Sequence, residues 1–143
     1  MKSQTVYSKT APLDEVKSVA KEILKLLPKN AVIFLKGDLA AGKTTFTNAV
    51  VEQLGLGTAT SPTFSLQQVY GDSFFHYDFY RMEFEEIANL GLIDEFEKEG
   101  LHFAEWADEN LINLLVNAGF NVFCIKINKE PNQREYILEE LHA

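Results

Sequence analysis

Two spacings of apolar residues alternate along the chain and predict alternating helices and strands. Apolar residues recur at helical spacing over 13–27 and again over 44–54. Pro12 stands where the first of these helices would begin, and Gly55 where the second would end. Between them, residues 31–35 form a short continuous apolar run, which is expected of a strand buried on both faces.

The second half of the chain contains more β-forming segments. Aromatic and β-forming residues dominate 65–70 and 74–80, and the Gly71-Asp72-Ser73 turn between them indicates a β-hairpin. The remaining predicted elements are helices at 83–90, 92–99 and 110–116 and strands at 101–104, 121–127 and 135–141, the last two joined by a turn at 128–132. This alternation predicts an α/β fold over 1–143 in a single domain, with a mixed central β-sheet flanked by helices.

Composition and charge narrow the function classes. The 143 residues are 46% hydrophobic and 24% charged, as in ordinary globular domains, and no apolar run approaches the ~18 residues of a membrane span. A net charge of −8 makes the chain a poor counterion for phosphate backbones, so we expect it not to hold DNA or RNA by itself. The amino end lacks an apolar signal core, and the single cysteine, Cys124, cannot form an internal disulfide, so we expect a cytoplasmic location.

One motif carries specific chemistry. The segment Gly37–Thr44 fits G-x-x-x-x-G-K-[ST] and lies between a predicted buried strand and a predicted helix. Backbone N–H groups at a helix amino end attract phosphate, and Gly42 lets the backbone approach closely. Lys43 would reach the β- and γ-phosphates, while the hydroxyl of Thr44 would face Mg²⁺. The sequence therefore predicts a P-loop (Walker A) site for a nucleotide.

A nucleotide site also needs a carboxylate, and two candidates each end an apolar strand. Asp78 follows the strand at 74–77 and Glu105 follows the strand at 101–104, and either could hold Mg²⁺ or position water. His76 and His102 alternate with aromatic residues inside these strands and have no metal-ligand spacing. We interpret both histidines as structural.

The remaining residues favour ATP hydrolysis over other nucleotide chemistry. The segment 128–131 begins like the guanine-reading N-K-x-D but lacks its Asp, which disfavours GTP. A small-molecule phosphotransferase (kinase) would need an acceptor pocket and an arginine-bearing lid, whereas the chain has only Arg81 and Arg134 and no lid-like insertion. The sequence therefore favours an ATPase that acts on a partner, and a small-molecule kinase remains the alternative.

Several motifs together resemble the TsaE (formerly YjeE) family, the bacterial ATPases of tRNA threonylcarbamoyladenosine synthesis. They are, in order, Gly37-Asp38-Leu39, Gly42-Lys43-Thr44-Thr45, Ser61-Pro62-Thr63-Phe64, His76-Tyr77-Asp78-Phe79-Tyr80-Arg81, Leu90-Gly91-Leu92 and Glu105-Trp106. The resemblance covers roughly residues 31–134. The P-loop alone is generic, but the later elements are specific to this family.

The resemblance implies a set of site residues for ATP or ADP with Mg²⁺. Thr44 and Glu105 would ligate Mg²⁺, Asp78 would be an essential acidic residue, and Thr63 would lie near the γ-phosphate in a switch segment. The residues implied to bind nucleotide are Gly37, Asp38, Leu39, Ala40, Ala41, Gly42, Lys43, Thr44, Thr45, Trp106 and Arg134. Ser8 and Thr10 are candidates for the contact with adenine.

The resemblance also implies partners, and at one position the sequence departs from the family pattern. TsaE proteins act on the TsaD–TsaB complex, which modifies position 37 of tRNA, so the ATPase would be weak alone and would meet tRNA only through that complex. The family usually has glycine where Ala40 stands. Alanine is disfavoured at positive φ by ~1 kcal/mol or more, so either φ is negative here or the nucleotide binds somewhat more weakly.

Overall fold

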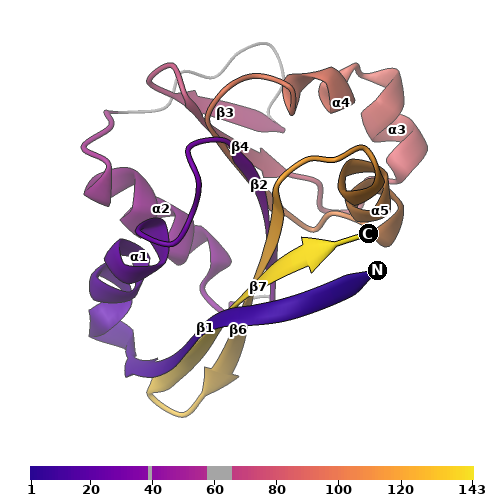
Figure 1. The fold of residues 1–143 in the computed structure, drawn as a ribbon. Coiled ribbons are helices and arrows are strands. Elements are labelled where there is room, and N and C mark those ends of the chain that lie inside the picture. The colour runs from indigo at the N-terminus through magenta and orange to yellow at the C-terminus, as the bar shows by residue number, and fades with distance from the viewer. Residues whose placement is uncertain (39, 58–65) are drawn as a thin grey trace.

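A mixed β-sheet forms the centre of the molecule (Figure 1). The computed structural model describes residues 1–38, 40–57 and 66–143, and within them the sheet has seven strands in the order β1-β7-β6-β2-β5-β4-β3. The strands are β1 Lys2–Pro12, β2 Ala31–Lys36, β3 Gln67–Tyr70, β4 Phe74–Asp78, β5 Leu101–Glu105, β6 Val122–Glu130 and β7 Gln133–His142. The central strands β6, β2, β5 and β4 run parallel, and β1, β7 and β3 are antiparallel to their neighbours. The predicted α/β fold with a mixed sheet is confirmed.

Helices cover both faces of the sheet (Figure 1). On one face lie α1 Val16–Leu24, preceded by a 3₁₀ turn at Leu13–Glu15, and α2 Lys43–Gln53. On the other face lie α3 Phe84–Asn89, α4 Leu92–Glu95 and α5 Glu109–Asn117. No helix within the described residues is long and apolar enough to cross a membrane.

Strand β2 holds the two apolar layers together. All of its residues from Ala31 to Leu35 are buried. Val32 and Phe34 pack in the layer beneath α5, while Ile33 and Leu35 pack in the layer beneath α1 and α2. A strand buried on both faces is held firmly, so the loop that leaves its carboxyl end starts from a rigid point.

The carboxyl ends of three parallel strands meet where that loop begins. Leu35 of β2 lies opposite Glu105 of β5, and Glu105 lies opposite Asp78 of β4. The loop after β2 leads directly into α2, whose first turn is closed by the hydrogen bond from the Phe46 N–H to the Gly42 carbonyl (2.8 Å). Open α/β sheets bind ligands at this edge.

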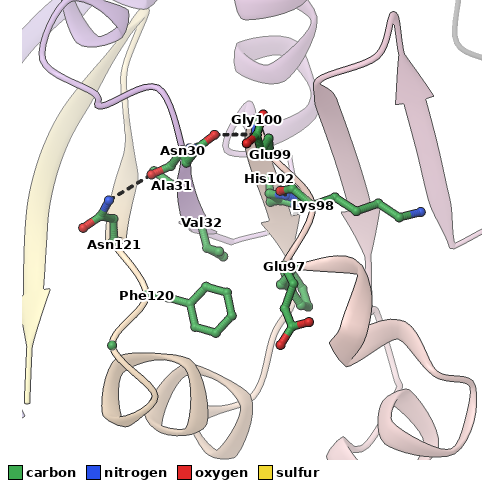
Figure 2. A pocket seen from close by; sticks show the side chains of 12 residues that line it. Asn30, Ala31, Val32, Glu97, Lys98, Glu99, Gly100, His102, Phe120 and Asn121 are labelled. Atoms are coloured by element: carbon green, nitrogen blue, oxygen red, sulfur yellow. Dashed lines mark hydrogen bonds between the residues drawn. The ribbon is translucent and has the colours of Figure 1, made fainter.

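At the opposite end of the parallel strands, hydrogen bonds join the segments that enter them (Figure 2). The Asn30 side chain accepts from the Gly100 N–H (2.8 Å), and Asn121 donates to the Asn30 carbonyl (3.0 Å). Asn30, Gly100 and Asn121 line a cavity of about 220 Å³. Its wall includes His102, whose Nε2 donates to the Lys98 carbonyl (2.7 Å), so that Nδ1 accepts from the Tyr77 hydroxyl (2.7 Å). The interpretation of His102 as structural agrees with this buried network.

Three parts of the fold differ from the sequence-based prediction. Strand β1 was not predicted, because as an edge strand it is exposed along most of its length and lacks a clear apolar alternation. Helix α4 stops at Glu95 instead of continuing to residue 99. Strands β6 and β7 are longer than predicted, and their turn is only Pro131-Asn132, with φ of 60° at Asn132.

Candidate functional site

The loop from Gly37 to Thr44 joins β2 to α2, as the motif predicts. A Cβ at Gly37 would lie 2.7 Å from the Ile127 carbonyl oxygen of β6, so packing against the sheet excludes any larger residue there. Gly42 begins the helix with φ of 106°, which a side chain rarely tolerates. Both motif glycines are therefore required by the backbone path of the loop.

Ala40 is the strained position of this loop. Its φ is 65°, in the left-handed region, which excludes the first of the two alternatives, a negative φ. Its side chain is exposed, so the described part of the chain offers little packing that could compensate for the conformation. An L-residue pays about 1–2 kcal/mol there, and the strain is present before any ligand arrives.

Lys43 lies inward at the start of α2. It is 5% exposed, its Nζ donates to the Gly37 carbonyl, and the ammonium lies 3.4 Å from the centre of the Trp106 ring. Burial lowers the pKa of Lys43, and the nearby charges of Glu105, Asp78 and Asp38 partly oppose that shift. The loop therefore holds a poorly hydrated cation over an aromatic face, which is a favourable place for an anionic ligand.

Glu105 is a buried carboxylate at the end of β5. It is 4% exposed, and its Oε2 and Oε1 lie 3.2 and 3.4 Å from the Thr44 hydroxyl. His76 Nε2 lies 2.6 Å from Oε2. This contact was missed by the sequence interpretation, although His76 and Asp78 are two residues apart on one strand and therefore share a face.

An aromatic pair borders the site on the β4 side. The Trp106 and Tyr80 rings are 5.1 Å apart, and Trp106 and Arg81 both have positive φ (61° and 63°). The exposed Asp78 carboxylate accepts from the Tyr80 N–H (3.0 Å), which stabilises the turn after β4. Together with the loop they line a cavity of about 320 Å³, bounded by Ala40, Gly42, Lys43, Thr44, Thr45, Asp78, Tyr80, Glu105 and Trp106.

Arg134 of β7 contacts the Gly37–Thr44 loop from the side opposite the aromatic pair. Its Nε donates to the Ala41 carbonyl (2.9 Å), and its Nη1 donates to the Gln133 and Glu130 carbonyls (2.8 and 3.3 Å). It lines a second cavity, of about 420 Å³, beside the β6–β7 turn. Arg134 is thus next to the loop and outside the cavity that holds Lys43.

Most of the sequence-predicted residues come together, and some do not. Thr44, Asp78, Glu105 and Trp106 meet around Lys43, although they come from three separate segments. Ser8 and Thr10 pair with Ile137 and Glu135 in the sheet and line neither cavity. Leu39, and the predicted switch segment 61–64 with Thr63, lie outside the described residues.

The donor set suits one kind of metal ion. A hydroxyl and a carboxylate are hard oxygen donors, and Mg²⁺ keeps several waters while taking one or two protein ligands beside substrate phosphates. Thr44 and Glu105 fit that pattern, with their oxygens 3.2 Å apart. Within the described part of the chain, no three His, Cys, Asp or Glu side chains gather as a metal site.

Comparison with known proteins gives consistent matches. The family model described as "Threonylcarbamoyl adenosine biosynthesis protein TsaE" matches residues 10–136. The "tRNA threonylcarbamoyladenosine biosynthesis protein TsaE" of Bacillus subtilis is 35% identical, over 93% of this chain and 91% of its own length. The protein of the same name from Rickettsia felis is 40% identical, over 66% of this chain and 58% of its own length. The crystal structure of Bacillus subtilis YdiB superposes with a TM-score of 0.72 at 28% identity, covering 98% of this chain and 88% of that one.

Proposed function

Because this chain belongs to the TsaE family, we propose that it binds and hydrolyses ATP in the synthesis of N6-threonylcarbamoyladenosine at position 37 of tRNA. The observation that carries the proposal is the placement of Lys43, Thr44 and Glu105 around one cavity at the carboxyl ends of β2 and β5. The proposal extends to a cytoplasmic protein whose hydrolysis supports repeated turnovers of a TsaD–TsaB complex.

The loop would bind the phosphates of ATP through its backbone and its lysine. The N–H groups at the start of α2, an 11-residue helix, lack partners within the helix and lie at the positive end of its dipole. The Lys43 ammonium contacts the Gly37 carbonyl and the Trp106 ring. A phosphate would give that ammonium a charged acceptor, so we propose that Lys43 leaves the Trp106 ring when nucleotide binds.

Thr44 and Glu105 would hold Mg²⁺, whereas Asp78 would act on the attacking water. When bound, the ion neutralises charge that develops on the transferring phosphoryl group. We assign to Asp78, whose exposed carboxylate faces the same cavity, the orientation of the attacking water. Thr63 is proposed to act near the γ-phosphate.

The chain offers few groups to stabilise the transition state, which supports a role for partners. Its arginines are Arg81 and Arg134, and Arg134 already donates to three backbone carbonyls. A trans-acting arginine can contribute about 10³–10⁵ in rate. We therefore propose that the TsaD–TsaB complex completes the site and raises the rate. The net charge of −8 suits docking to a partly basic protein more than to tRNA.

Steady-state phosphate release tests this proposal. The protein is assayed alone, with TsaD–TsaB, and with tRNA alone, using γ-labelled ATP and a panel of small-molecule acceptors. We expect slow release alone, stimulation by TsaD–TsaB, and label only in inorganic phosphate. Stimulation by tRNA alone would contradict the assignment of partner, and a labelled acceptor would support a phosphotransferase instead.

A further inference from the structure

The contact between His76 and Glu105 joins two side chains that are both nearly removed from solvent. Their side chains are 11% and 5% exposed, and His76 Nε2 lies 2.6 Å from Glu105 Oε2. A carboxylate only accepts hydrogen bonds, so Nε2 carries the hydrogen and donates it. Donation to a charged acceptor is a strong hydrogen bond, which fixes one oxygen of Glu105.

The sheet, and not chain flexibility, brings these residues together. Strands β4 and β5 are parallel, with His76 opposite Phe103 and Asp78 opposite Glu105. His76 and Glu105 are therefore diagonal neighbours on the face that carries α2. Strand pairing thus sets both Cα positions, and the His76 ring reaches the carboxylate from its place in the sheet.

Among the described residues, no lysine pairs directly with Glu105 and makes the histidine redundant. Lys43 Nζ, the nearest cation of the loop, donates to the Gly37 carbonyl. In the described part of the chain, the donors that reach the Glu105 carboxylate are the Thr44 hydroxyl and His76 Nε2. Of these two donors, Thr44 is itself a proposed metal ligand, whereas His76 has no role in the proposed function.

We propose that His76 is a positioning residue for the divalent cation of this site. Its N–H holds Oε2 of Glu105, which stops the carboxylate from rotating and keeps both oxygens beside the Thr44 hydroxyl, Oε2 at 3.2 Å and Oε1 at 3.4 Å. Residues that orient a metal ligand in this way typically contribute 10–100-fold to metal affinity or activity. This inference rests on the proposed function, because it presumes that Thr44 and Glu105 take the cation that accompanies ATP.

The coupling between metal and nucleotide measures this role without an activity assay. ADP is titrated by calorimetry in Mg²⁺ and again in EDTA, and the ratio of the two affinities gives the coupling. In His76→Phe, which keeps a ring and removes the donor, we expect the coupling to fall about 10–100-fold. Affinity in EDTA should stay within about twofold, since the phosphate-binding groups are untouched.

Two further variants separate positioning from a general structural role. His76→Gln keeps an N–H donor at similar reach and should restore most of the coupling. His102→Gln is the matched control: His102 lies on β5, faces the opposite side of the sheet, and should change stability but not the coupling. If His76→Phe does not fold by circular dichroism, His76→Asn replaces it, because its amide is too short to reach Glu105.

The possible results are distinguishable. Full coupling in a folded His76→Phe, or equal loss in His76→Phe and His76→Gln, would overturn the positioning role while leaving the proposed function intact. Absence of ADP binding by the unchanged protein in both solutions would overturn the proposed function and this inference with it.

Discussion

Replacing Ala40 by glycine should stabilise the folded protein, although it removes a side chain and adds a flexible residue. Ala40 has φ of 65°, a conformation that costs an L-residue about 1–2 kcal/mol and costs glycine almost nothing. Glycine also gives the unfolded chain more freedom, which offsets about 0.4–1 kcal/mol. Since the Ala40 methyl is exposed, no buried contact is lost. The net gain is about 0.5–1 kcal/mol, or about 2–4 °C in Tm for a chain of this size.

Thermal unfolding by circular dichroism measures this effect, and the adjacent alanine is the control. Ala41 is 1% exposed and does not have a positive φ, so Ala41→Gly should lower Tm through lost packing and added chain entropy. The affinity for ADP should stay within about twofold in Ala40→Gly, because the strain already exists in the free loop. A Tm that falls in both variants would refute the assignment of a strained left-handed conformation to Ala40.

Three other predictions concern the site and its surroundings. Glu105→Ala should lower kcat about 10²-fold or more and affect ATP binding less, because the carboxylate acts mainly on the transition state; an unchanged kcat with TsaD–TsaB present would reduce Glu105 to a strand-end residue. Trp106 fluorescence should change on addition of Mg-ADP, since the Lys43 ammonium lies 3.4 Å from the ring centre and should move; a flat titration at calorimetric saturation would contradict this. Burial lowers the pKa of His102 below its usual 6.5, so the unfolded chain binds more protons and the free energy of unfolding should fall as pH drops below about 6.5. Denaturant titrations between pH 7.5 and 5.5 test this, and His102→Gln should show a shallower pH dependence than the unchanged protein.

Local patterns in the sequence were sufficient to predict the loop and the strands that position it. The motif Gly37–Thr44 needs no distant information, because its glycines and its lysine act within one strand–loop–helix unit. A continuous apolar run predicted β2, which is buried on both faces, and the apolar residues on either side of His102 predicted β5. The ends of β4 and β5 then indicated Asp78 and Glu105.

Features that depend on how strands pair could not be derived from spacing alone. The contact of His76 with Glu105 requires the register of β4 against β5, and the bond from Arg134 to the Ala41 carbonyl requires β7 to lie beside the loop. The edge strand β1 exposes most of its residues, so little apolar signal marks it. The positive φ of Trp106 arises where the chain turns after β5, and residues 106–108 include no glycine or asparagine that would signal that turn.

The proposed function depends on the binding of nucleotide phosphates by Lys43, which a calorimetric titration of Mg-ADP measures. A charge-assisted hydrogen bond contributes roughly 1.5–3 kcal/mol, so a folded Lys43→Ala should bind at least about tenfold more weakly than the unchanged protein. Lys36→Ala is the matched control, because Lys36 ends β2 beside the loop, pairs with Glu109 (2.8 Å) and does not line the cavity that Lys43 shares with Thr44 and Glu105. Its affinity should stay within about twofold. Equal affinity in Lys43→Ala and the unchanged protein would contradict the assignment of this loop as a phosphate site.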